Sequence, residues 1–167
     1  MENELTQLKA EIRDLTARRD IHSIIINYMR GQDRLLPDVH LSSFHADTRV
    51  DCGLFEGDAA EFVNFAQGFL GDLQSSHHML GQMDIQIDGN SATGEVYFLA
   101  QHRIQQDQQP YDLFVAGRYI DSYQDRGDGW KIASRKELID WVRSDPASDS
   151  FLLENPTLNI GQRGKNG

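Results

Sequence analysis

The segment from Ile21 to Arg34, with the sequence IHSIIINYMRGQDR, constrains the fold of this chain more than any other. Its apolar residues cover more than one face of a helix, which is the pattern of a helix buried on most sides. A buried helix needs a sheet or other helices packed around it. The same segment carries Tyr28 and ends near Asp33, so it brings an acidic side chain to the last turn of a buried element.

The residues before this segment predict a helical arm. Between Glu2 and about Arg18, four apolar residues recur at spacings of 3, 4 and 3 within an otherwise charged sequence: Leu5, Leu8, Ile12 and Leu15. Such a narrow stripe is typical of a helix that packs against one partner surface. That surface belongs either to the arm's own domain or to a neighbouring subunit.

The second half of the chain predicts a meander of long strands. Upstream of it, Asp58 is a good N-cap for a helix whose apolar face carries Phe62, Phe65 and Phe69. Helices followed by a run of strands predict an α+β fold, with the helices on one face of a strongly bent antiparallel sheet. Four stretches with strand-like patterns, separated by turn-forming residues, supply the strands: about 77–88, 92–105, 112–124 and 130–141.

Length and charge limit the domain count and the partners. We place one domain at 19–143, between the arm (1–18) and a tail (144–167) whose prolines and glycines predict a loop. The formal net charge of the 167 residues is −10, from 16 basic and 26 acidic side chains that are scattered along the chain. This balance disfavours nucleic acid or an anionic membrane as a partner, because phosphate binding requires a basic surface.

Cysteine content and hydropathy indicate the compartment. Cys52 is the one cysteine, which excludes an internal disulfide and a Cys-rich metal site. The first residues lack the apolar region of a signal peptide, and no apolar run approaches the ~20 residues that a spanning helix requires. We therefore expect a cytoplasmic protein.

Histidine is the side chain best suited to exchange protons near neutral pH, because its unperturbed pKa is about 6.5. His77 and His78 are neighbours in a predicted strand, so they must point to opposite faces. Simple alternation puts His77 on the inward face with Met83 and Ile85, unless a bulge near Gly81 reverses the pattern.

The remaining residues define what chemistry is available. His102 shares its strand face with Val96 and Phe98 and is expected to point inward, whereas His40 and His45 lie near predicted turns and are expected to be solvated. No HExxH metal motif, G-x-S-x-G elbow or glycine-rich phosphate loop is present. The residues alone therefore leave acid-base chemistry without a cofactor or metal, or plain ligand binding.

Several stretches taken together resemble the SnoaL-like group of the nuclear transport factor fold. They are the pair Tyr28 and Asp33, and the sequences HADTRVDCGLFEG, HHMLGQMDIQIDG and DGWKIASR. Within this group the chain is similar to bile acid 7α-dehydratase, scytalone dehydratase and hexachlorocyclohexane dehydrochlorinase. The resemblance implies a cystatin-like, cone-shaped fold, in which N-terminal helices close a curved antiparallel sheet around a deep pocket.

The resemblance also implies the catalytic residues. An aspartate at the end of the first core helix pairs with a sheet histidine in those enzymes, and these residues match Asp33 and His78. Three further catalytic positions match Tyr28, His102 and Arg135. At Cys52 this chain departs from both dehydratases, which have a tyrosine there, and at Tyr28 it departs from the dehydrochlorinase, which has a lysine. We therefore expect a substrate different from that of either dehydratase.

These positions imply a cofactor-independent lyase that eliminates water or another small group. His78 would remove a proton from carbon while Asp33 orients it. Tyr28, together with His102 or Arg135, would stabilise negative charge or protonate the departing group. An isomerase of the same substrate class and a non-catalytic binder of an apolar ligand are the alternatives.

The expected pocket favours a hydrophobic cyclic or aromatic substrate, although the same residues would also suit an ordinary core. We further expect a homo-oligomer, either a dimer or a trimer, without a cofactor or a metal ion. The residues predicted to line the pocket are mostly apolar: Cys52, Phe65, Phe69, Val96 and Phe98.

Overall fold

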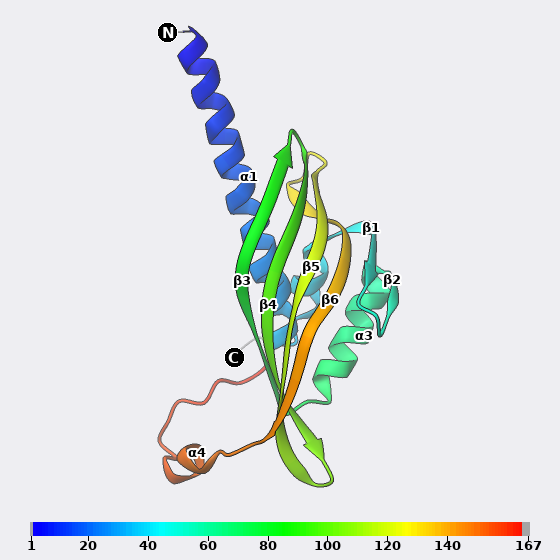
Figure 1. The fold of residues 1–167 in the computed structure, drawn as a ribbon, viewed down its shortest axis with the longest axis vertical. Coiled ribbons are helices and arrows are strands. Elements are labelled where there is room, and N and C mark those ends of the chain that lie inside the picture. Colours follow the sequence, from blue (N-terminus) through cyan, green and yellow to red (C-terminus); the bar gives the residue numbers. More distant parts are fainter. Residues whose placement is uncertain (1, 165–167) are drawn as a thin grey trace.

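The computed structural model describes residues 2–164 and has the predicted α+β order of elements. Three helices and two short strands are followed by four long strands and a short C-terminal helix (Figure 1). The elements are α1 (Glu2–Asp33), α2 (Pro37–Ser42), β1 (Phe44–Asp51), β2 (Glu56–Asp58), α3 (Ala59–Gly71), β3 (Ser75–Asp88), β4 (Ser91–Gln106), β5 (Gln109–Asp125), β6 (Trp130–Pro146) and α4 (Ser150–Glu154).

The strands form one curved, six-stranded sheet in the order β2-β1-β6-β5-β4-β3. Neighbouring strands are antiparallel except β1 and β6, which are parallel, so the expectation of a wholly antiparallel sheet is wrong at this pair. In Figure 1, α1 and α3 cover the same side of the sheet. The core lies between them and the sheet, and its fully buried side chains include Ile21, Ile25, Tyr28 and Val96.

Helix α1 is continuous over 32 residues, whereas the sequence suggested an arm followed by a second helix. Its N-terminal end extends beyond the sheet (Figure 1). The apolar stripe of the arm, Leu5, Leu8, Ile12 and Leu15, is 53–66% exposed, so it is not docked on its own domain. Docking on a neighbouring subunit therefore stays a prediction.

Helix α3 begins as predicted, because Asp58 is its N-cap. The Asp58 side chain accepts a hydrogen bond from the backbone N–H of Glu61, and the Glu61 side chain accepts one from the backbone of Asp58. This capping box satisfies two backbone donors at the start of the helix. The phenylalanine face of α3 is thereby fixed against the sheet.

A bulge in β3 decides which of the two adjacent histidines faces the helices. Leu80 pairs with Phe98 and Met83 pairs with Val96, so β3 contains one more residue than β4 over this stretch. An extra residue reverses the alternation of faces. His78 therefore points inward and His77 is exposed, so simple alternation gave the wrong residue and the alternative of a bulge near Gly81 is confirmed.

A similar irregularity lies in β6. The register shifts between Ile132 and Ser134, where Ala133 is the extra residue. Beyond the shift, Arg135 and Glu137 point to the same inner face as Ile132. Without it, both side chains would point away from the helices.

The inner face of the sheet holds a fully buried ion pair. Two hydrogen bonds join the guanidinium of Arg135 to the carboxylate of Asp121, at 2.8 and 2.6 Å, and both side chains are 0% exposed. The guanidinium lies over the rings of both Tyr28 and Tyr119, at 4.1 and 3.9 Å from their centroids. This arrangement ties α1 to β5 and β6 through one cation.

The connection after α1 folds back tightly on the helix. A Cβ atom at Gly31 would lie 2.6 Å from the backbone nitrogen of His40, so the close approach of α2 requires glycine there. His40 is fully buried, and His45 is buried with its Nε2 2.9 Å from the carbonyl oxygen of Gln124. The expectation that these two histidines are solvated is therefore wrong, because α2 and β1 pack into the core.

The tail is more ordered than the predicted loop. Strand β6 continues to Pro146, and the chain then forms α4 and returns to the end of α1. The Arg163 guanidinium donates hydrogen bonds to the carbonyl oxygens of Asp33, Leu70 and Leu73. Residues 165–167 of the predicted tail lie outside the described residues.

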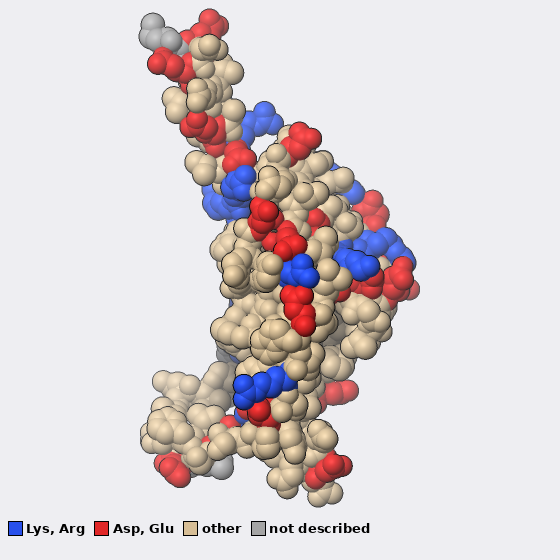
Figure 2. Space-filling model, in the orientation of Figure 1, with Lys and Arg blue, Asp and Glu red and all other residues tan. Residues whose placement is uncertain are grey.

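The surface carries mixed charges. In the view of Figure 2, Lys and Arg side chains are interspersed with Asp and Glu side chains instead of forming one stripe. One such group joins Arg118 to Glu95 and Asp140. Among the described residues, no helix is both long enough and apolar enough to cross a membrane.

Replacing Asp121 with Asn tests the buried ion pair. The variant leaves the Arg135 cation buried without a carboxylate, and we expect the free energy of unfolding to fall by about 3–5 kcal/mol. Urea denaturation followed by circular dichroism measures the change. Asp140→Asn is the matched control, because it breaks the Arg118 pair on the opposite face of the sheet and should hardly alter stability. Equal effects of the two substitutions would contradict the role given to Asp121.

Candidate functional site

The carboxylate of Asp33 is the centre of a hydrogen-bond network at the end of α1. Its Oδ1 lies 2.6 Å from Nδ1 of His78 and accepts a hydrogen bond from the Ser76 hydroxyl at 3.2 Å. Its Oδ2 accepts the backbone N–H of His78 at 2.9 Å. Asp33 is 7% exposed and the His78 side chain is 6% exposed, so helix and strand meet here with little water.

This network favours the ionised form of Asp33. Burial by itself raises the pKa of the carboxyl, but the hydrogen bonds and charge of His78, with the Ser76 hydroxyl, lower the pKa below its usual range. A carboxylate can only accept hydrogen bonds, so Nδ1 of His78 must carry the proton between them. The other ring nitrogen, Nε2, makes no hydrogen bond to any residue within 2–164.

His102 joins the network through Ser76. Its Nδ1 lies 3.1 Å from the Ser76 oxygen, and the rings of His78 and His102 are 5.4 Å apart in an edge-to-face arrangement. Because the Ser76 hydroxyl donates its proton to Asp33, Nδ1 of His102 is the donor to the Ser76 oxygen. Burial, and after it the charge of His78, lowers the pKa of His102 to about 4.

Both histidines line a cavity of about 110 Å³ between α3 and the inner face of the sheet. Its lining combines polar side chains from α1 and the long strands with apolar side chains from α3, β4 and β5. Two apolar side chains at its edge are partly exposed, Leu54 at 80% and Phe69 at 46%. The lining residues are Gln32, Cys52, Leu54, Phe62, Phe65, Ala66, Phe69, Leu70, His78, Phe98, Ala100, His102, Val115, Tyr119 and Glu137.

Most of the predicted site residues come together here. Asp33 contacts His78, and the lining includes both predicted histidines and four of the five predicted pocket residues: Cys52, Phe65, Phe69 and Phe98. Val96 does not line the cavity, because it is fully buried in the core.

Tyr28 and Arg135 lie behind the cavity wall instead of facing it. The Tyr28 hydroxyl accepts a hydrogen bond from the Gln32 side chain, and burial raises the Tyr28 pKa above its usual range. Arg135 is engaged by Asp121. A direct role of either side chain on a substrate is not supported by this geometry, because neither reaches the cavity.

Several polar residues of the site, among them Ser76, Glu137 and Tyr119, were not anticipated from the sequence. Ser76 precedes the bulge in β3, and Glu137 follows the register shift in β6, so simple alternation gives no reliable signal for either. Tyr119 lines the cavity, and its hydroxyl has no hydrogen-bond partner within 2–164. Its strand face could have been found by alternation with Asp121 and Tyr123, which are also buried.

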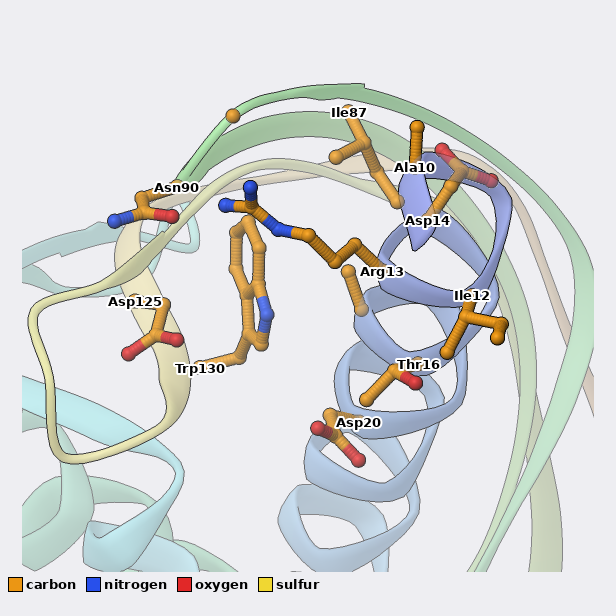
Figure 3. A pocket seen from close by; sticks show the side chains of 12 residues that line it. Ala10, Ile12, Arg13, Asp14, Thr16, Asp20, Ile87, Asn90, Asp125 and Trp130 are labelled. Carbon is orange, nitrogen blue, oxygen red and sulfur yellow. The ribbon is translucent and has the colours of Figure 1, made fainter. Parts of the chain in front are cut away.

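A larger cleft, of about 450 Å³, lies between the arm and the turns that follow β3 and β5 (Figure 3). The Arg13 guanidinium lies near the Trp130 indole there, with Asp20 and Asp125 on the walls. None of the predicted site residues lines this cleft. Because Arg13 is ~30 Å from Asp33 along α1, the cleft is separate from the histidine site.

Nothing in the described part of the chain resembles a metal site: no three His, Cys, Asp or Glu side chains within residues 2–164 are grouped as metal ligands. The ionisable groups of the cavity can instead donate and accept hydrogen bonds and transfer protons. Acid-base chemistry is therefore what the arrangement itself can support.

The chain is similar to sequence relatives and to solved structures. An uncharacterized protein of Mycobacterium tuberculosis is 25% identical over 129 residues, which cover 75% of this chain and 87% of the relative. A candidate scytalone dehydratase from Novosphingobium aromaticivorans superposes with a TM-score of 0.70 at 18% identity, covering 81% of this chain and 91% of its own.

Two further structures have similar folds. A hexachlorocyclohexane dehydrochlorinase superposes with a TM-score of 0.68 at 15% identity, covering 83% of this chain and 92% of its own. An NTF2-like protein with a cystatin-like fold from Novosphingobium aromaticivorans has a TM-score of 0.66 at 17% identity, covering 93% and 97%. At these identities the likenesses establish the fold, which is the cystatin-like fold that the sequence predicted.

The family comparison is more specific than the structural one. The SnoaL-like domain matches residues 13–136, from the arm through the long strands to β6. The match includes Asp33, His78, His102 and the register-shifted start of β6. This chain belongs to the SnoaL-like domain family.

Proposed function

We propose that this protein is a cofactor-independent lyase that removes water or another small group from a hydrophobic cyclic compound. One observation carries the proposal: Asp33 binds Nδ1 and the backbone N–H of His78, while Nε2 of His78 has no partner among the described residues and the ring lines a cavity. An imidazole oriented in this way by a carboxylate is suited to act as a general base.

In the proposed reaction, Nε2 of His78 removes a proton from a carbon atom of the substrate. Asp33 keeps the imidazole in one tautomer and stabilises the imidazolium that forms. The electron pair of the broken C–H bond forms a C=C bond as the leaving group departs. General acid-base help of this kind contributes a factor of roughly 100–10,000 in rate.

A carbonyl group next to this carbon makes its proton more acidic, and the carbonyl oxygen becomes negatively charged in the transition state. Tyr119 is the candidate donor to this oxygen, because its hydroxyl has no partner among residues 2–164 and its side chain lines the cavity. Burial raises its pKa well above the usual range, so the phenol keeps its proton. The family resemblance implied Tyr28 for the stabilisation of negative charge. We assign this role to Tyr119, because Tyr28 lies behind the cavity wall.

Cavity size and lining favour a small cyclic substrate. Phenylalanines and aliphatic side chains form most of the wall, which suits an apolar ring. A cavity of about 150 Å³ is enough to bind benzene in another protein, so the 110 Å³ here must widen slightly to admit a six-membered ring. Leu54 and Phe69, which are partly exposed at the edge, are the side chains that would move.

The fold supports this class of reaction. Solved neighbours of the chain are named for loss of water and of hydrogen chloride, and both reactions are eliminations. The arm also supports the expected homo-oligomer: its apolar stripe is 53–66% exposed and would be covered by a neighbouring subunit.

Substitution of Asp33 or His78 tests whether His78 is the base. With a cyclic β-hydroxy ketone or β-chloro ketone as substrate, we expect His78→Ala and Asp33→Asn to lower kcat roughly 100- to 10,000-fold. His77→Ala is the matched control, because His77 is the exposed neighbour in the same strand. Full activity of His78→Ala, or equal losses in both histidine variants, would refute the base.

Mass spectrometry of the product separates the three candidate functions. A lyase gives a product lighter than the substrate by the mass of the eliminated molecule, an isomerase gives a product of equal mass, and a binder returns the compound unchanged. We expect the lighter product. Recovery of only unchanged compound from the cavity would contradict an enzymatic role.

His102 predicts a loss of stability at acid pH. The folded protein keeps His102 neutral down to about pH 4, whereas the unfolded chain binds that proton near pH 6.5. Stability is therefore fully present above about pH 6.5 and falls as the pH drops to about 4, by roughly 3 kcal/mol at most. The buried His40, whose pKa burial lowers to about 3, contributes in the same direction.

Urea denaturation at pH 7 and pH 4.5 measures this effect. His102→Gln cannot take up the proton, so we expect it to lose less stability between these pH values than the wild-type protein. The same loss in both proteins would show that His102 is not held neutral.

A further inference from the structure

Glu137 is the carboxyl group of the cavity that the proposed reaction has not yet used. In the register of the sheet it pairs with Tyr119, and it lies two residues beyond the buried Arg135 on the same inner face. It lines the same cavity as His78 and His102, which come from β3 and β4. The cavity is therefore lined by a base on β3 and by a carboxyl group on β6.

This carboxyl has no partner. No hydrogen bond or ion pair joins Glu137 to another residue in the described range 2–164. Arg135 makes no hydrogen bond to it, because Nε and Nη2 of that guanidinium bind Asp121 and Nη1 has no partner among the described residues. A half-buried carboxyl that lines the cavity without a hydrogen-bond partner in the protein is available to a ligand, which suggests a function toward that ligand.

The surroundings favour the protonated form. Burial raises the pKa of the Glu137 carboxyl, while the charges of Arg135 and His78 act in the opposite direction. A protonated carboxyl can donate a hydrogen bond or a proton, which an ionised carboxylate cannot do. The cavity thus holds a carboxyl group, which can act as an acid when it is protonated, and a base that is not paired with it.

We propose that Glu137 is the general acid of the reaction and that the leaving group is a hydroxyl, so that the enzyme is a dehydratase of β-hydroxy carbonyl compounds. This inference rests on the proposed function, because it requires His78 to remove the proton from carbon. A hydroxyl is a poor leaving group unless it is protonated as it departs. A chloride leaves as a stable anion and needs no acid.

The step is balanced. Nε2 of His78 takes the proton from the carbon next to the carbonyl, and the C–H electron pair forms the C=C bond. The C–O bond breaks, its electron pair stays on oxygen, and that oxygen takes the proton of Glu137 and leaves as water. The proton on His78 then returns to Glu137 through water, which restores both groups for the next turnover.

Two probes separate the acid from the base. 3-Hydroxycyclohexanone and 3-chlorocyclohexanone both eliminate to cyclohex-2-enone, with loss of water or of hydrogen chloride, and ultraviolet absorption follows the product of both. After subtraction of the uncatalysed rate, we expect Glu137→Gln to lower the ratio of hydroxy to chloro turnover roughly 100- to 10,000-fold. Glu137→Asp should recover part of this ratio, because it restores an acid.

The controls distinguish failure of the acid from failure of the base. Glu95→Gln changes a strand glutamate that pairs with Arg118 outside the cavity, and the ratio should stay as in the wild-type protein. If His78→Ala abolishes turnover of both probes while Glu137→Gln leaves the ratio unchanged, the inference is wrong and the proposed function stands. If His78→Ala retains both activities, or the wild-type protein eliminates neither probe, the proposed function itself fails for this substrate class.

The pH profile and infrared spectra give independent readouts. With the hydroxy probe, kcat should fall at high pH as Glu137 loses its proton, and this decline should be missing with the chloro probe. An infrared difference spectrum between the wild-type protein and Glu137→Gln should contain the C=O band of a protonated carboxyl at pH 7. A carboxylate band in its place would overturn the inference without any substrate.

Discussion

The buried pair of Arg135 and Asp121 is the interaction on which the rest of the site depends. Its guanidinium lies over the rings of both Tyr28 of α1 and Tyr119 of β5, so a single cation joins the central helix to the sheet. Asp33 follows Tyr28 by about one and a half helical turns. Holding the helix at Tyr28 therefore brings the Asp33 carboxylate to β3. Asp121 binds Arg135, and Glu137 remains without a partner in the wall of the cavity.

The site is assembled from departures from regular structure. A bulge in β3 turns His78 toward Asp33, and a register shift in β6 turns Arg135 and Glu137 inward. Glycine at position 31 lets α2 fold against the end of α1, where Asp33 lies. Regular strands would have directed these ionisable groups into solvent. The bulge in β3 and the register shift in β6 therefore place them on the inner face of the sheet.

Much of the fold could be predicted from the sequence because it depends on local patterns. The period of the apolar residues located the buried helix and the four long strands, and Asp58 marked the start of α3. The parallel pairing of β1 with β6 could not be predicted, since the two strands are far apart in the chain and no local pattern encodes their direction. The docking of the tail through Arg163 has no local signal either.

The candidate site was predictable only in part. Asp33 and His78 were predicted from the resemblance to the family. Alternation of strand faces gave His77 instead, because it does not account for the bulge in β3. Sequence does not tell whether an inward polar group faces a cavity or another polar group. Arg135 illustrates this, because its partner Asp121 lies on another strand and removes it from the cavity.

The central claim is that Asp33 holds His78 with its proton on Nδ1, so that Nε2 is free to act as a base. Nitrogen-15 NMR of the histidine side chains tests this most directly, because the two ring nitrogens give different shifts when protonated and unprotonated. For neutral His78 the account predicts a protonated Nδ1 and an unprotonated Nε2, and a loss of this preference in Asp33→Asn. A proton on Nε2 in the wild-type protein would contradict the account.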